Sequence, residues 1–274
     1  MIIATDLDGT LISSDTSISN ENLGAIKRLF EYGAHIVLVT GRTFYEILPQ
    51  LTDCPYIDYF VYSNGACIYK QGSGLAFSNC MPAGAALSIY DIFNSYKTFV
   101  ELYTHGKPLV DKSKFCDSGF EFYKISPAFL PELKRSRIPV ENLNAEMEKN
   151  AADIEMFDVF FASMQERAEC RNRIETEFPD FQITTSLDNN LEVMNQGVNK
   201  GTGIKKLCEI AGYDLNDIVA FGDSKNDITM FEAIENSYAV SNACPELKKI
   251  SKGIACSNDE NIMLWAENKF YGSK

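Results

Sequence analysis

The sequence is poor in the residues that build zinc sites. Its 274 residues include only two histidines, His35 and His105, and its eight cysteines form no CxxC pair. Structural zinc usually takes four closely spaced Cys and His ligands, so this pattern disfavours a zinc protein. Several cysteines stand among apolar neighbours, as Cys208 does. We therefore expect most of them to be small buried side chains in a reducing compartment.

Positive charge is also scarce. The 25 Lys and Arg residues against 38 Asp and Glu leave a formal net charge of −13 and a pI near 4.7. The electric field of this net negative charge repels polyanions, which argues against nucleic acid or an anionic membrane surface as a general partner. One short basic run, from Lys134 to Arg137, interrupts this background, and we expect it to be a solvated surface.

Long apolar stretches are missing as well. No uninterrupted apolar run approaches the roughly 18 residues that a membrane-spanning helix needs. Asp6 follows Met1 too closely to leave room for a basic leader and a signal core. Because 45% of the residues are hydrophobic, a sizeable core can form, and we expect a globular, cytoplasmic protein.

Both ends of the sequence alternate apolar runs with amphipathic segments. Four runs lack polar alternation, as parallel strands buried on both faces do: residues 1–5, 35–40, 59–63 and 218–221. Residues 23–30 and 202–211 show helical periodicity. This order predicts an α/β fold, with a parallel-sheet core and helices on both faces.

The middle of the chain, from about Cys80 to Asn189, differs from both ends in residue composition. It is richer in aromatic residues and holds most of the prolines. Its patterns are strand-like at 99–103, 154–162 and 181–185, and helical at 83–96 and 165–177. We therefore expect a core formed by residues 1–80 and 190–274, with an inserted α+β domain over residues 81–189.

Two carboxylates, Asp6 and Asp8, stand at alternate positions where the first apolar run ends. Residues two apart on an extended chain project to the same side, and ligands bind beyond the carboxyl ends of strands in open α/β sheets. A second acidic cluster, from Gly222 to Asp227, follows the run 218–221. Two such clusters at neighbouring strand ends would crowd negative charge, which a cation relieves. Oxygen ligands of this kind favour Mg²⁺.

Two further features fit a phosphate site. Thr40 and Gly41 follow the second predicted strand and offer a hydroxyl and backbone amides. Lys200 precedes a predicted helix and can offset the charge of a phosphate dianion beside Asp6. Taken alone, each has an ordinary reading, as a helix cap or as a surface lysine.

Together these residues make the chain resemble the haloacid dehalogenase superfamily phosphatases of the Cof-like group. The resemblance covers roughly residues 1–79 and 191–274, with all four motifs in order. Three shorter features of the group also occur: Ser63-Asn64-Gly65-Ala66, Gly197 to Gly201, and Ser241-Asn242-Ala243. Ser224 and Ser241 stand where glycine is frequent, and neither replaces a charged group. The resemblance implies a Rossmann-like core, with an α/β cap inserted between the second and third motifs, which would select the substrate.

The resemblance also implies a role for each site residue. Asp6 would be the nucleophile that forms an aspartyl-phosphate, and Asp8 the general acid and then the base. Magnesium would be bound by the Asp6 carboxylate, the Asp8 main-chain carbonyl and Asp223, with Asp227 supporting the metal without direct contact. Five residues would hold the phosphoryl oxygens: Leu7, Thr40, Gly41, Lys200 and Asn226.

The sequence therefore predicts magnesium-dependent hydrolysis of a small phosphorylated metabolite, such as a sugar phosphate. Two alternatives stay open. One is a phosphomutase or phosphotransferase that passes the phosphoryl group to a sugar. The other is a non-catalytic sensor that binds phosphate or becomes phosphorylated on Asp6, although a sensor gains nothing from an acid/base at Asp8.

Overall fold

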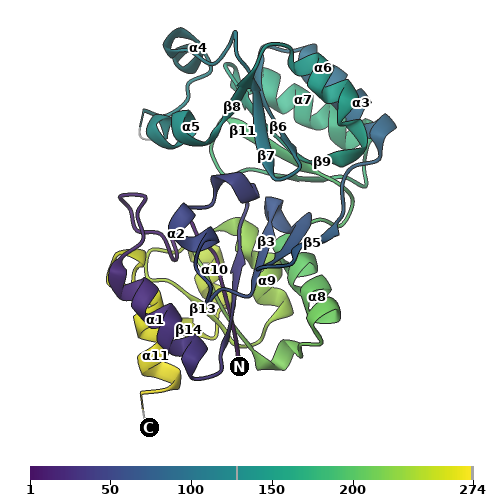
Figure 1. Ribbon diagram of the computed structural model, residues 1–274. Helices are drawn as coiled ribbons and strands as arrows, with labels where there is room; N and C mark the ends of the chain where they lie inside the picture. Colours follow the sequence, from purple (N-terminus) through teal and green to yellow (C-terminus); the bar gives the residue numbers. More distant parts are fainter. Residues whose placement is uncertain (128, 273–274) are drawn as a thin grey trace. The chain divides into compact units, whose positions relative to one another are not determined.

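The computed structural model describes residues 1–127 and 129–272, which form two compact units (Figure 1). Of the described residues, the first unit comprises 1–41, 47–77 and 199–272, and the second comprises 42–46, 78–127 and 129–198.

These units differ at their edges from the predicted division into 1–80 with 190–274 and 81–189. Residues from 190 onwards were expected in the core, but Asn190–Met194 forms a strand, β11, in the sheet of the second unit. It pairs antiparallel with Ile154–Phe161, β9, and this pairing is not visible in the sequence pattern. Residues 42–46 also belong to the second unit.

An eight-stranded sheet in the order β14-β13-β12-β1-β2-β3-β4-β5 forms the centre of the first unit. The strands from β14 to β3 are parallel, and β4 is antiparallel to β3. Their bounds are β1 Ile2–Thr5, β2 His35–Val39, β3 Tyr59–Tyr62, β4 Cys67–Lys70, β5 Gly74–Ser78, β12 Ile218–Gly222, β13 Ser237–Ala239 and β14 Gly253–Ile254. The parallel core predicted from the four apolar runs is confirmed.

Helices cover both faces of this sheet, as predicted. The chain moves along the sheet in one direction from β1 to β2 and in the other from β12 to β13, and right-handed crossovers then place the connecting helices on opposite faces. Helices α1 and α11 lie side by side (Figure 1), where Arg28 forms a bidentate ion pair with Glu267. The bounds are α1 Asn20–Glu31, α2 Pro49–Thr52, α8 Lys200–Ala211, α9 Ile228–Ala233, α10 Pro245–Ile250 and α11 Ile262–Phe270.

The second unit contains a six-stranded sheet in the order β10-β11-β9-β6-β7-β8, antiparallel except for the β7–β8 pair. The remaining strands are β6 Thr98–Thr104, β7 Lys107–Asp111, β8 Ile138–Val140 and β10 Gln182–Thr184. The helices are α3 Ala83–Asn94, α4 Asp117–Phe122, α5 Leu130–Ser136, α6 Leu143–Lys149 and α7 Met164–Glu177. This is an α+β unit, and the sequence did not predict its β7, β8, α4, α5 and α6.

The two faces of the second sheet differ in character. The apolar stripe Phe157, Val159 and Phe161 of β9 is buried in a core with side chains of α3 and α7. Asp158 projects to the other face, because side chains alternate along a strand. There it lies in register between Glu101 of β6 and Glu192 of β11.

The basic run at 134–137 is only partly a solvated surface. Lys134 and Arg135 are 49% and 40% exposed, but the side chain of Arg137 is 3% exposed. Arg137 pairs with Glu46 and, at 2.7 Å, with Glu101. The expectation of a solvated run is therefore wrong for Arg137, because its acidic partners lie far away in the sequence.

Every cysteine is free, and four are buried: Cys54, Cys67, Cys170 and Cys208. Among residues 1–127 and 129–272, no helix combines the length and the hydropathy that crossing a membrane would require. Short 3₁₀ helices complete the fold: η1 Phe44–Glu46, η2 Ser63–Gly65, η3 Ala151–Asp153, η4 Leu215–Asp217, η5 Lys225–Asp227 and η6 Asn258–Glu260.

Candidate active site

The two acidic clusters lie at the carboxyl ends of β1 and β12, which are neighbouring parallel strands. The chain leaves these strands in opposite directions along the sheet, which makes their carboxyl ends the usual ligand position of an open α/β fold. Asp6 follows β1, and its backbone N–H donates to the carbonyl of Phe221 at 3.0 Å. Asp223 follows β12 directly.

Three carboxylates meet one ammonium group at this position. Oxygens of Asp6, Asp223 and Asp227 lie within 4.8 Å of one another. The Nζ of Lys200 donates to Oδ1 of Asp6 at 2.7 Å and to Oδ1 of Asp227 at 2.6 Å. Lys200 is the first residue of α8, whose start is fixed by the side chain of Asn199 accepting from a backbone N–H. By formal charge, these four side chains carry two excess negative charges.

Asp227 already uses both carboxylate oxygens. Its Oδ1 accepts from Lys200, and its Oδ2 accepts from the backbone N–H groups of Asp223 and Ser224, each at 3.0 Å. The side chain is fully buried. This geometry favours a role for Asp227 in positioning Lys200 and the turn after β12.

Burial and crowding change the proton affinity of the acids. Burial raises the pKa of Asp6 well above its ordinary value; Lys200 opposes this effect, while Asp227, Asp223 and Asp8 add to it. Burial also raises the pKa of Asp223 to about 6, with a further contribution from Asp227. Although burial disfavours the charged form of Lys200, Asp227 and Asp6 raise its pKa above the ordinary value.

The residues fit a magnesium ion. Its charge would balance the two excess negative charges, which add to the effect of burial on the pKa values of Asp6 and Asp223. The available donors are carboxylate oxygens, which Mg²⁺ prefers, and the cluster contains neither His nor Cys.

A tight turn after Asp6 brings the backbone close to Asp223. Gly9 has a φ of 71°, and a Cβ atom there would lie 2.5 Å from Oδ2 of Asp223. Its carbonyl accepts from Nδ2 of Asn242 at 2.8 Å. The preceding residue, Asp8, is exposed, and its charge acts on both Asp6 and Asp223. An exposed carboxyl beside the cluster can exchange protons with water.

The predicted phosphate-holding residues lie around the same strand ends. Thr40 follows β2, the other neighbour of β1, and is 1% exposed. Gly41 follows it in the chain. The side chain of Leu7 is fully buried, so only its backbone could contact a phosphate. Asn226 lies in η5, next to the acidic turn.

Sequence reasoning gave no role to Asn64, which lies in η2 after β3. Its Oδ1 accepts from Nδ2 of Asn226 at 3.3 Å. The signal was present in the sequence as the feature Ser63-Asn64-Gly65-Ala66. No spacing rule connected it to Asn226, which lies 162 positions away.

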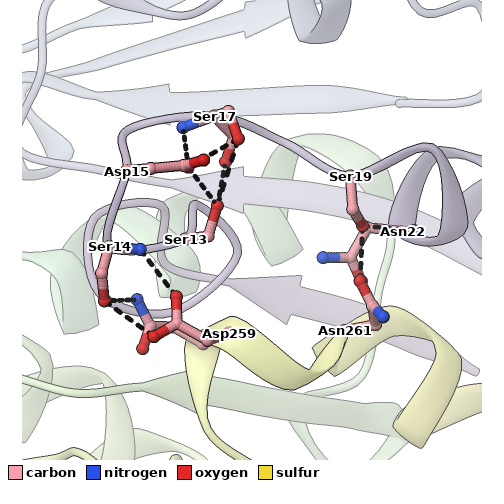
Figure 2. Close-up of a pocket in the computed structure, with 9 residues that line it drawn as sticks. Ser13, Ser14, Asp15, Ser17, Ser19, Asn22, Asp259 and Asn261 are labelled. Atoms are coloured by element: carbon pink, nitrogen blue, oxygen red, sulfur yellow. Dashed lines mark hydrogen bonds between the residues drawn. The ribbon is translucent and has the colours of Figure 1, made fainter.

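A polar pocket of about 420 Å³ also lies in the first unit (Figure 2). Its lining is Ser13, Ser14, Asp15, Ser17, Ser19, Asn22, Asn258, Asp259 and Asn261. Figure 2 shows these side chains hydrogen-bonding to one another, for example Asp15 with Ser17 and Asp259 with Ser14. Because the lining holds two carboxylates and no cationic side chain, the pocket does not suit a phosphate ester.

Comparison with known proteins identifies the family of the chain. Residues 3–264 match the model of a family described as haloacid dehalogenase-like hydrolase. The chain is 28% identical over 272 residues to a 5-amino-6-(5-phospho-D-ribitylamino)uracil phosphatase of Bacillus subtilis, with 94% of each chain covered.

Solved structures show the same fold. A haloacid dehalogenase-like hydrolase from Bacteroides thetaiotaomicron matches with a TM-score of 0.82 at 21% identity, covering 98% of this chain and 99% of that one. A sugar phosphatase of haloacid dehalogenase subclass IIB matches with a TM-score of 0.80 at 21% identity, covering 98% of each chain. The chain therefore belongs to the haloacid dehalogenase-like hydrolase family, and the resemblance to this family found in the sequence is confirmed.

Proposed function

We propose that the protein hydrolyses small phosphate monoesters in a magnesium-dependent reaction, through an aspartyl-phosphate on Asp6. The observation that carries this proposal is the position of the Lys200 ammonium group, 2.7 Å from Oδ1 of Asp6 inside a cluster of acids. A carboxylate can attack an anionic phosphate only where cationic groups offset the repulsion. Lys200 supplies one such group, and Mg²⁺, held by Asp6, Asp223 and the Asp8 carbonyl, would supply further positive charge at the phosphoryl oxygens.

In the first step, a carboxylate oxygen of Asp6 attacks phosphorus, and the bond from phosphorus to the ester oxygen breaks. The leaving oxygen takes a proton from the carboxyl group of Asp8. The products of this step are the free alcohol and the phosphorylated Asp6. Splitting hydrolysis into two displacements replaces one difficult step with two easier ones.

In the second step, Asp8 takes a proton from a water molecule, whose oxygen attacks phosphorus. The bond from phosphorus to the Asp6 oxygen breaks, which releases inorganic phosphate and restores the Asp6 carboxylate. Asp8 again carries the proton that it needs for the next cycle. Its exposure suits it to this exchange with water.

During both steps, Lys200 stays charged and oriented because Asp227 holds it from the other side. Backbone groups of Leu7 and Gly41, together with Thr40 and Asn226, would bind the remaining phosphoryl oxygens. These groups stabilise the charge that spreads over those oxygens during transfer.

We further propose phosphorylated sugars or polyols as the substrate class, selected by the second unit acting as a cap. Two similar proteins support this class by their names: one is called a sugar phosphatase, and the other acts on a phosphoribityl compound. The choice within the class depends on the cap residues, which the fold does not identify.

The test is phosphate release from p-nitrophenyl phosphate and from a panel of sugar phosphates, polyol phosphates, nucleotides and pyridoxal phosphate, with Mg²⁺ present and then chelated. We expect release that depends on the metal. No release from any compound would refute the proposal. Isomerised sugar phosphate without net release would favour a mutase, and a phosphorylated Asp6 that survives for hours would favour a sensor.

A further inference from the structure

The turn after β3 has an unusual backbone. Ser63, Asn64 and Gly65 have φ values of 49°, 53° and 98° in succession. L-residues rarely adopt positive φ, because this backbone conformation is strained unless the surroundings compensate. Both Ser63 and Asn64 are nevertheless buried, at 0% and 2% exposure. The fold therefore holds Asn64 in a fixed place inside the first unit.

The backbone and the amide of Asn64 contact the loop after β2. Its backbone N–H donates to the carbonyl of Thr40 at 3.0 Å. Its amide faces Gly41 so closely that a Cβ atom on Gly41 would lie 3.1 Å from Oδ1 and 3.4 Å from Nδ2. A side chain at position 41 would therefore press against Asn64.

The same amide also reaches the loop after β12, because Oδ1 of Asn64 accepts from Nδ2 of Asn226 at 3.3 Å. Asn226 is held from its other end by the hydroxyl of Ser224, which donates to its Oδ1 at 2.6 Å. Asn64 therefore fixes which way the Asn226 amide points.

The turn further packs against the start of α8, where Lys200 lies. A Cβ atom on Gly65 would lie 2.4 Å from the carbonyl oxygen of Asn199, and one on Gly203 would lie 2.8 Å from Cα of Gly65. One short turn thus contacts the three segments that carry Thr40, Asn226 and Lys200.

From these contacts we infer that Asn64 is a positioning residue, which holds the Thr40–Gly41 loop and the Asn226 amide in the arrangement that receives the phosphoryl group. The inference rests on the proposed function, since it assigns a task to Asn64 in that same site. Asparagine suits the position because it tolerates the left-handed backbone better than other L-residues and brings an amide to the two loops.

The test variant is Asn64→Gly. Glycine adopts a φ of 53° without cost, so this change removes the amide and leaves the backbone unstrained. The matched control is Thr16→Gly, which replaces another residue with positive φ, 66°, on an exposed turn of the same unit. For both variants, we would measure the thermal midpoint, kcat and KM for phosphate ester hydrolysis, and the affinity for inorganic phosphate by calorimetry.

We expect Asn64→Gly to lower kcat/KM and phosphate affinity by about 10- to 100-fold, which is typical for residues that orient the ligands of a site. Thr16→Gly should change neither. Asn64 would act through Asn226. The double variant Asn64→Gly, Asn226→Ala should therefore lose less kcat/KM and phosphate affinity than the product of the two single-variant fold-losses.

Wild-type phosphate affinity in Asn64→Gly would overturn the inference, whether or not the thermal midpoint falls. Fully additive losses with Asn226→Ala would overturn the coupling between the two amides. If the wild-type protein bound phosphate and hydrolysed no ester, the proposed function would fail, and the calorimetry would still decide the role of Asn64.

Discussion

The Nζ of Lys200 lies 2.7 Å from Oδ1 of Asp6, although 194 positions separate the two residues in the sequence. The same nitrogen lies 2.6 Å from Oδ1 of Asp227. All three side chains are at most 5% exposed. Lys200 is therefore the counter-charge on which two buried acids depend, and the protein's stability and its chemistry should both respond to its loss.

Replacing the charge of Lys200 should destabilise the protein. In Lys200→Met, Asp6 and Asp227 lose their cationic partner, and breaking a buried pair in this way typically costs about 3–5 kcal/mol. Urea unfolding without metal measures the effect. The control is Lys206→Met on the same helix, whose ion pair with Glu209 is exposed and should contribute less than about 1 kcal/mol. Equal stability of the two variants would contradict this account of the cluster.

Removing magnesium should stop turnover and lower the thermal midpoint. The ion would bind the folded site and not the unfolded chain, so it stabilises the fold by mass action. Thermal unfolding with chelator and then with increasing Mg²⁺ measures this shift. Asp223→Asn should abolish most of the shift because it removes a carboxylate from the cluster. A thermal midpoint that magnesium leaves unchanged in the wild-type protein would argue against a metal at this position.

The sequence predicted the parallel core and the strand ends at which Asp6, Thr40 and Asp223 lie, for a physical reason. Buried parallel strands are apolar throughout, so the ends of β1, β2 and β12 are visible where polar residues begin, and Asp6, Thr40 and Asp223 stand at those ends. The carboxyl ends of parallel strands meet at one edge, and this rule brings the residues together without any knowledge of their contacts.

Long-range polar pairing was not predictable in the same way. Arg137 belongs to a basic run, and nothing local indicates that Glu46 and Glu101 bury it. Asn64 likewise meets Asn226 through the fold alone. The sequence analysis placed β11 in the wrong unit for a related reason. Nothing in the residues of β11 indicates that this strand pairs with β9.

Removing the side chain of Arg137 should lower the free energy of unfolding of the second unit. Its guanidinium lies between the carboxylates of Glu46 and Glu101, and Oε1 of Glu101 is buried with no hydrogen-bond partner. Although burial opposes its charge, these carboxylates raise the pKa of Arg137 well above its ordinary value.

Arg137→Met should therefore cost about 3–5 kcal/mol, again the range for a broken buried pair. Limited proteolysis and urea unfolding would measure the loss. The control is Arg173→Met, whose ion pair with Glu177 is 44% and 45% exposed. A loss no larger than that of the control would show that the buried pair contributes little.

Stability should also depend on pH through Asp158. Burial raises the pKa of Asp158 well above its ordinary value, and the facing Glu101 and Glu192 add to this, while Asn190 and Arg137 oppose it. Between the pKa of the unfolded chain, near 4, and the higher folded value, the folded state binds the extra proton. The free energy of unfolding should therefore fall as the pH rises through that window.

Asp158→Asn has no proton to lose in this pH range and keeps an acceptor for Nδ2 of Asn190. Its thermal midpoint should therefore decline less between pH 5 and pH 8 than that of the wild-type protein, as thermal scans across this range would show. Asp180→Asn, at an exposed position, should follow the wild-type curve. Parallel curves for Asp158→Asn and the wild-type protein would rule out this source of pH dependence.

The most direct test of the central claim is to trap the phosphoryl group on its acceptor. Enzyme mixed with excess ³²P-labelled substrate and Mg²⁺ is quenched in acid during turnover and divided into two portions. One portion is counted for protein-bound ³²P, and the other is reduced with borohydride, which releases the phosphate, and mapped by mass spectrometry. The account predicts protein-bound ³²P in the first portion and conversion of Asp6 to homoserine in the second. Asp6→Asn should take up no label and lose turnover by about 10⁴-fold or more, with its fold intact. Label on a different residue, or continued turnover by Asp6→Asn, would contradict the account.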